Sequence, residues 1–168
     1  FFGMKDGLEE FLQKWNLMEK EQNLKEWNRM LQPVTLSLVA INVVVFILMS
    51  LTGDTEDPSL MARSGAMTWD SIVVERQYYR VFTAMFLHFG AEHLLQNMLV
   101  LLLTGTRMER ALGKIRYLVI YLGAGLCSSL VSLLFTLKGT GNVAAGASGA
   151  IFGIMGGILF LVLKDKIT

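Results

Sequence analysis

Three side chains that could carry out acyl transfer stand in apolar surroundings in this sequence. His93 and Asn97 are four residues apart, and Ser148 lies within the run Gly-Ala-Ser-Gly-Ala. On a helix, a spacing of four places His93 and Asn97 on the same face. A hydroxyl that faces an imidazole and an amide is a candidate nucleophile beside donors for an oxyanion. The run lacks the strand-to-helix turn of the Gly-x-Ser-x-Gly elbow, so we expect Ser148 inside a continuous helix.

The same residues also have a purely structural interpretation, and their spacing leaves both interpretations open. A serine among glycines in a membrane helix commonly serves helix packing, and a His–Asn pair commonly makes an interhelical hydrogen bond. Gly149, Gly153 and Gly157 recur every four residues, which is typical of a helix that packs closely against a neighbour.

Composition and charge place these residues in a membrane protein. Hydrophobic residues make up 53% of the 168 and charged residues 17%, whereas a soluble domain has about 25% charged residues. The net charge of +1 offers no overall basic footprint for nucleic acid. A single cysteine, Cys127, excludes a fold held together by disulfides.

Long runs with few charges predict the membrane spans. The runs 34–51, 117–137 and 142–163 contain no charged residue, and 81–106 contains only Glu92. About 20 residues of helix cross a hydrocarbon core of about 30 Å. The sequence therefore predicts an all-α polytopic transmembrane helix bundle, with spans at about 34–51, 91–113, 117–137 and 143–163.

The distribution of Lys and Arg predicts the orientation. Eleven lie on the side of the two termini and four on the other side, which places both termini in the cytoplasm. Spans two and four then both run inward from the outer face. Ser148 is expected about six residues, or roughly 9 Å, below the outer start of its span, at a depth that His93 and Asn97 can reach.

Two segments lie outside the spans. Residues 1–32 carry apolar residues at helical spacing, and they are interpreted as a cytoplasmic amphipathic segment or a connector to span one. The long loop 52–80 is expected outside, with its aromatic part in the outer leaflet.

These motifs together resemble the rhomboid intramembrane serine proteases. Gly146-Ala147-Ser148-Gly149 is similar to their Gly-x-Ser-Gly motif, and the stretch from His93 to Asn97 is similar to their His-x-x-x-Asn motif. His88 matches a frequent family position, and Gly105, Glu109 and Gly113 resemble the pattern that ends the second span. The resemblance covers roughly residues 34–165, which makes 33–168 a partial rhomboid transmembrane domain.

The resemblance implies a role for each site residue. Ser148 would be the nucleophile, and His93 and Asn97 would stabilise the oxyanion together with the Ser148 backbone N–H. Gly146 and Gly149 would permit close packing around Ser148, and His88 would support the site. Substrates would be transmembrane proteins cut near the outer leaflet of the bilayer, with no metal or cofactor.

One departure from the family pattern concerns the general base. The family core has six spans and carries its base histidine on the sixth, whereas this chain has four predicted spans and no histidine besides His88 and His93. The sequence therefore predicts a truncated chain that by itself does not hydrolyse peptides. Faces left by missing helices are expected to favour an oligomer.

Two other functions remain as alternatives. A proteolytically inactive rhomboid-like protein that binds membrane clients is the first, although the presence of Ser148 favours an enzyme. A small transporter is the second; it would need a buried acid as its coupling site, whereas Glu92 and Glu109 both lie near helix ends. The compact core favours a bacterial-type plasma membrane.

Overall fold

The computed structural model describes residue 13, residues 32–137 and residues 142–167. Contacts divide the chain into two units, 1–32 and 33–168, and the description below concerns the second. The predicted amphipathic segment at 1–32 falls almost wholly outside the described residues. Helices are the regular elements of the described part, and its one isolated bridge pairs Met67 with Ala144.

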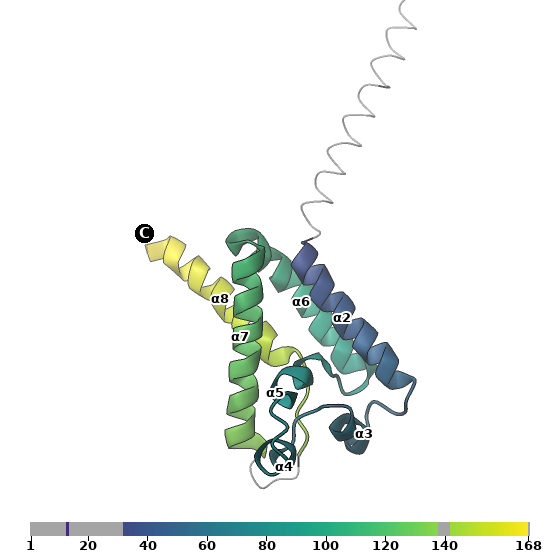
Figure 1. Ribbon diagram of the computed structural model, residues 1–168. Coiled ribbons are helices and arrows are strands. Elements are labelled where there is room, and N and C mark those ends of the chain that lie inside the picture. The colour runs from purple at the N-terminus through teal and green to yellow at the C-terminus, as the bar shows by residue number, and fades with distance from the viewer. Residues whose placement is uncertain (1–12, 14–31, 138–141, 168) are drawn as a thin grey trace, which may run out of the picture. The chain divides into compact units, whose positions relative to one another are not determined.

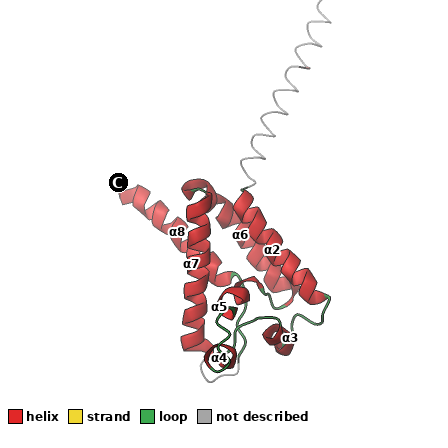
Figure 2. Cartoon of the chain, viewed as in Figure 1, coloured by secondary structure: helices red, strands yellow, loops and turns green. Residues whose placement is uncertain are grey.

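Long helices form the bundle, and short helices connect the first of them to the second (Figures 1 and 2). The long helices are α2 (Pro33–Ser50), α6 (Gly90–Leu112), α7 (Lys114–Ser132) and α8 (Ser148–Ile167), with α7 continuing into a π-helical turn, Leu133–Leu137. The connection holds α3 (Pro58–Arg63), α4 (Trp69–Val73), α5 (Arg80–Thr83) and a 3₁₀ turn, Ala84–Phe86. The all-α helical bundle predicted from the sequence is thereby confirmed.

Two of the helices are long and apolar enough by themselves to cross a membrane. They are α2, with a mean hydropathy of 2.2, and Lys114–Phe135, with 2.1. The pair Arg80–Phe86 and Gly90–Leu112 passes the same test with a bend of 89°, and Ser148–Lys164 is a shorter apolar helix. The bounds of predicted spans one to three lie close to those of α2, α6 and α7, and the four-span arrangement stays a prediction.

The buried carboxylate of Glu109 joins the end of α6 to the beginning of α2. Its Oε1 accepts from the Val34 backbone N–H at 3.0 Å, and its Oε2 accepts from the Thr35 N–H and hydroxyl at 2.8 Å each. The first N–H groups of a helix have no partner within the helix, and an anion there is favourable. Glu109 thus caps α2 from another helix and fixes the α2–α6 pair.

Glycines on α8 bring this helix against its neighbours. A Cβ atom on Gly149 would lie 2.3 Å from Ser128 Cβ, and one on Gly153 would lie 2.2 Å from Ala124 Cβ, both on α7. One on Gly157 would lie 2.4 Å from Met108 Cε on α6. The four-residue glycine pattern therefore serves helix packing, and α8 lies against both α6 and α7.

Arg80 ties the connecting loop together. Its guanidinium is largely buried and donates to the backbone carbonyls of Ala62 and Ala66, the latter at 2.8 Å. A buried charge is tolerated only when it is hydrogen-bonded, and here the partners are carbonyl oxygens from the end of α3 and the turn after it. The loop is thereby held in place where Met67 and Ala84 contact the segment before α8.

Candidate active site

Ser148 is the first residue of α8, and an extended segment leads into it. The helix begins five residues later than the predicted span 143–163, so the expectation of a continuous helix around Ser148 is wrong. The reason is a long-range pairing: Met67 and Ala144 exchange backbone hydrogen bonds of 2.9 and 2.8 Å. The Gly146 N–H donates to the Ala84 carbonyl at 2.8 Å. Ser148 therefore sits at a turn from extended chain to helix.

Gly146 occupies a backbone conformation that other residues rarely adopt, with φ at 130°. A Cβ atom at this position would lie 2.9 Å from His93 Cε1 and 3.7 Å from Ser148 Oγ. The imidazole and the hydroxyl thus approach the same point from α6 and α8. A side chain at residue 146 would occupy the space between them.

A pocket of about 360 Å³ opens between α6 and α8 and collects the predicted site residues. Its lining includes His93, Asn97 and Ser148 together with apolar side chains of α8. The structure therefore brings together the three residues that the sequence singled out. The sequence analysis did not anticipate the other lining residues, which are Gln96, Val100, Ile151, Phe152 and Met155.

The amide of Asn97 is oriented by its own helix. It is largely buried, and its Nδ2 donates to the His93 carbonyl at 2.8 Å. An amide nitrogen carries two N–H groups, so the second is left for another acceptor. Asn97 is thus held in one orientation while it lines the pocket.

His88 lies beneath the site and contacts both halves of it. Its side chain is fully buried, and its ring stands edge-on to that of His93 with centroids 5.2 Å apart. Its Nε2 accepts from the Ala147 backbone N–H at 3.4 Å. His88 therefore supports the chain immediately before Ser148.

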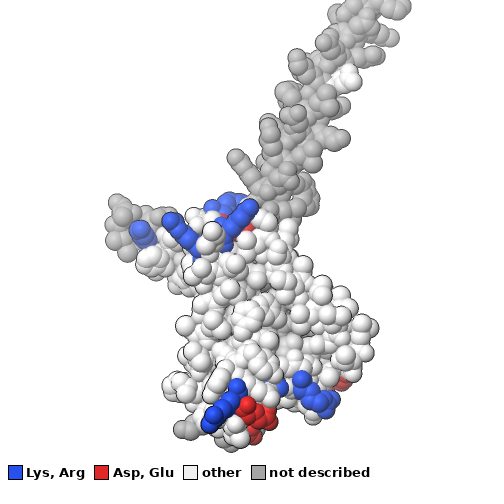
Figure 3. Space-filling model, viewed as in Figure 1, with Lys and Arg blue, Asp and Glu red and all other residues white. Residues whose placement is uncertain are grey.

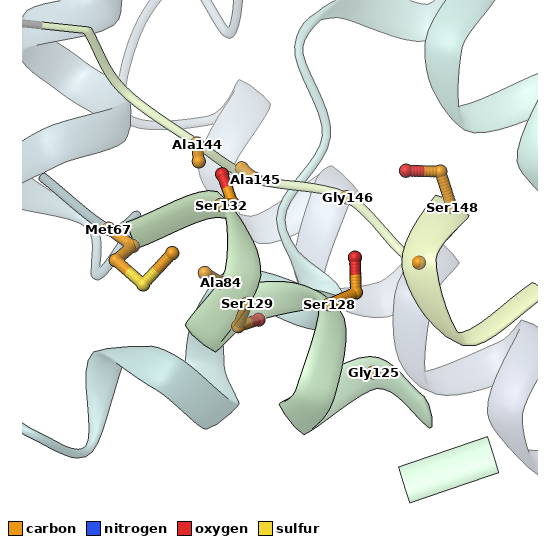
Figure 4. A pocket seen from close by; sticks show the side chains of 11 residues that line it. Met67, Ala84, Gly125, Ser128, Ser129, Ser132, Ala144, Ala145, Gly146 and Ser148 are labelled. Atoms are coloured by element: carbon orange, nitrogen blue, oxygen red, sulfur yellow. The ribbon is translucent and has the colours of Figure 1, made fainter. Parts of the chain in front are cut away.

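A smaller cavity of about 90 Å³ lies on the other side of Ser148, against α7 (Figure 4). Ser128, Ser129 and Ser132 line it together with Gly146 and Gly149. The sequence analysis missed this cavity, and the signal available was the spacing of four between Ser128 and Ser132, which places both on one helix face. Among the described residues, no group of three His, Cys, Asp or Glu side chains is arranged to hold a metal ion.

The arrangement suits the stabilisation of negative charge beside a hydroxyl. The first N–H groups of α8 have no carbonyl partner in their own helix, and the positive end of its dipole lies at Ser148. An imidazole and an amide lie across the pocket. A serine hydroxyl remains a weak nucleophile until a base removes its proton.

Helices long and apolar enough to cross a bilayer are those of an integral membrane protein, and a half-buried histidine and a serine line its pocket between α6 and α8. The Rhomboid domain model matches residues 75–168, more than half of the chain. The chain belongs to the rhomboid family.

Individual relatives agree with this assignment. Rhomboid protease GluP of Bacillus subtilis is 34% identical over 132 residues, which cover 79% of this chain and 25% of the relative. RHOMBOID-like protein 7 of Arabidopsis thaliana is 41% identical over 110 residues, covering 66% of this chain and 34% of the relative. Putative rhomboid protease YdcA of Bacillus subtilis is 32% identical over 133 residues, which cover 79% of this chain and 64% of the relative. The chain thus spans less than two thirds of the length of these relatives.

Proposed function

We propose that this chain carries the nucleophile and the oxyanion-binding groups of an intramembrane serine endopeptidase. The observation that supports this best is the common pocket of His93, Asn97 and Ser148 in a chain of the rhomboid family. The proposed substrates are transmembrane proteins, cut near the outer leaflet of the bilayer.

In the proposed reaction the Ser148 Oγ attacks the scissile carbonyl carbon while a base accepts its proton. The carbonyl oxygen becomes an oxyanion, which accepts hydrogen bonds from the Ser148 N–H, His93 and the second N–H of Asn97. The C–N bond then breaks, and the proton passes from the base to the leaving amine. Water then attacks the acyl-enzyme carbonyl while the base accepts its proton, and this proton passes to the Ser148 Oγ as the ester bond breaks. Gly146 and Gly149 leave space around Ser148 because they carry no side chain, and His88 holds the segment before Ser148.

The base of this Ser–His dyad is not assigned to either histidine of the 168 residues. His93 faces the oxyanion position, and the Nε2 of His88 already accepts from Ala147. We therefore expect the 168-residue chain by itself to be proteolytically inactive, and faces left open on the bundle to favour an oligomer.

The proposed topology keeps the prediction made from the sequence. Residues 1–32 form a cytoplasmic segment, and 33–168 form part of the rhomboid transmembrane domain with four spans. Both termini of the chain lie in the cytoplasm, in a plasma membrane of bacterial type. The excess of Lys and Arg on the side of the termini supports this orientation.

A cleavage assay in membranes tests the function. The complete gene product that contains these residues is co-expressed with a panel of single-span substrates, and the Ser148→Ala variant is compared with Ser50→Ala. Ser50 is an exposed serine of α2 whose hydroxyl donates to its own helix. Cleavage is expected to disappear with Ser148→Ala and to persist with Ser50→Ala. Cleavage that survives Ser148→Ala would refute the proposal.

The same experiment separates the enzyme from an inactive client-binding protein. Co-purification of a substrate without any cleavage, in the complete gene product with Ser148 intact, would favour the binding function. Fluorophosphonate labelling of the 168-residue chain tests its expected inactivity. Labelling of Ser148 that is lost with His93→Ala, together with hydrolysis of a membrane substrate, would show that His93 acts as the base.

A further inference from the structure

Basic side chains gather at one end of the helical unit, where α6 ends and α7 begins and where α8 also ends (Figure 3). Arg107, Lys114 and Arg116 are all exposed there. Glu109 is the only acid between residues 101 and 127, and its carboxylate is 1% exposed and occupied by the backbone of α2. Among the described side chains, the exposed surface of this end, here called the basic end, is consequently cationic. The Lys and Arg residues whose side chains are described there are Arg107, Arg110, Lys114, Arg116 and Lys164.

The opposite end has a different composition. Acidic and basic side chains are mixed there, as the red and blue atoms in the lower part of Figure 3 show. Arg80 is buried against carbonyl oxygens, so the exposed arginines of the opposite end are Arg63 and Arg76. The acids of this end are Asp54, Glu56, Asp57, Asp70, Glu75 and Glu92. Exposed positive charge without neighbouring exposed acids is thus found at the basic end and not at the opposite end, among the described side chains.

The basic side chains continue apolar stripes that face outward. Leu99, Leu103 and Arg107 are spaced four residues apart on α6, all exposed, so they lie on one face with the charge about 6 Å beyond Leu103. On α7, Ile115 is 79% exposed between the charged residues, and Val119 is 64% exposed one turn further. Outward apolar side chains in a membrane protein contact acyl chains. The basic groups therefore stand where the acyl chains give way to headgroups.

We propose that the basic end binds the phosphate groups of anionic phospholipids. Arg107, Lys114 and Arg116 supply the cationic donors, and the apolar side chains beside them contact the acyl chains of the same lipids. Continuity with the outward apolar surface favours a lipid over an acidic protein partner, because a soluble acidic peptide would leave Leu103, Ile115 and Val119 without a role. This inference does not depend on proteolysis.

Spin-labelled lipids measure the proposed binding directly. The complete gene product is reconstituted in phosphatidylcholine vesicles, and the association of labelled phosphatidylglycerol is compared with that of labelled phosphatidylcholine. Because both leaflets hold both lipids, the result does not depend on orientation. The wild type is expected to prefer phosphatidylglycerol, and the variant Arg107→Gln/Lys114→Gln/Arg116→Gln is expected to lose most of that preference, roughly fivefold per residue at one lipid site. The preference is also expected to fall as salt is raised.

Matched variants make the outcome decisive. Arg63→Gln/Arg76→Gln removes the exposed arginines of the opposite end and is expected to keep the preference. Arg107→Lys/Lys114→Arg/Arg116→Lys preserves the charge and is expected to keep it as well, which distinguishes lost binding from a damaged fold. An equal preference in wild type and triple Gln variant would overturn the proposal, as would an equal loss in the opposite-end variant. Displacement of labelled lipid by millimolar inorganic phosphate would overturn it in favour of a free-anion site, and displacement by a soluble acidic peptide in favour of a protein partner.

Discussion

At the scale of single residues, Gly146 is the position where backbone conformation and the site are most closely linked. Its φ of 130° and the 2.9 Å approach to His93 Cε1 both exclude a side chain. Gly146→Ala is expected to destabilise the fold by about 1–3 kcal/mol. Cleavage by the complete gene product is expected to fall further, because a displacement of about 1 Å can cost roughly 100-fold in rate.

Gly123→Ala is the matched control for this substitution. Gly123 lies within α7, is exposed, and has nothing within 4 Å of its would-be Cβ. Alanine there is expected to leave activity unchanged and to stabilise the helix slightly, by about 0.5–1 kcal/mol. Detergent unfolding curves and substrate cleavage check both variants. Equal effects of the two substitutions would contradict the assigned role of Gly146.

Asp57 gives the connecting loop a pH dependence. A hydrogen bond from the Ser59 backbone N–H holds the pKa of its carboxyl below the usual 3.8, because the carboxylate caps α3. A lowered folded-state pKa stabilises the cap above the unfolded-state pKa, and this contribution is lost as the pH falls through the folded-state value. Amide exchange of residues 59–61, corrected for the intrinsic rate, is expected to rise below pH 3.8.

Asp57→Asn keeps an acceptor at the cap without a titrating group. In this variant the exchange of residues 59–61 is expected to show no such rise. The same acid-induced rise in Asp57→Asn and wild type would show that another group is responsible.

At the scale of elements, the packing of α8 on α7 depends on individual glycines. A Cβ atom on Gly153 would lie 2.2 Å from Ala124 Cβ, and neither atom can move without its backbone. Gly153→Ala is therefore expected to separate the two helices and to cost about 1–3 kcal/mol through overpacking. Gly156, on the same helix, has nothing within 4 Å, and Gly156→Ala is expected to be neutral. Unfolding in mixed micelles compares the two, and a tolerated Gly153→Ala would disprove the close contact.

Element boundaries show where sequence reasoning succeeds and where it stops. Hydropathy and breakers placed spans one and two within a residue or so of α2 and α6, because Pro33, Gly90 and Gly113 act locally. The start of α8 was wrong because the pairing of Met67 with Ala144 joins segments 77 residues apart, which no local pattern reveals. The packing role of Gly149, Gly153 and Gly157 could be predicted because a spacing of four places them on one face of the helix.

The candidate site was predictable for a similar reason. His93, Asn97 and Ser148 carry distinctive chemistry in apolar surroundings, and their residue types and local spacing made them candidates. Gln96, Phe152 and the serines of α7 line cavities only because α6, α7 and α8 meet there. Their positions depend on tertiary packing, which the sequence pattern did not specify.

At the scale of the whole molecule, the bundle separates two kinds of surface. The pocket lies near the end where α8 begins, beside the connecting loop, and the basic end lies where α8 terminates. At the basic end, the buried carboxylate of Glu109 joins the end of α6 to the beginning of α2. This chain of the rhomboid family thus presents its candidate site residues and its cationic surface at opposite ends of the bundle.

Covalent labelling of the nucleophile tests the central claim most directly. The complete gene product in vesicles is treated with a fluorophosphonate, and the adduct is located by mass spectrometry in the wild type and in the His93→Ala and Asn97→Ala variants. We predict an adduct on Ser148, formed about 100-fold or more slowly when either oxyanion donor is removed. An adduct on another residue, or labelling of Ser148 at an unchanged rate in both variants, would contradict the account.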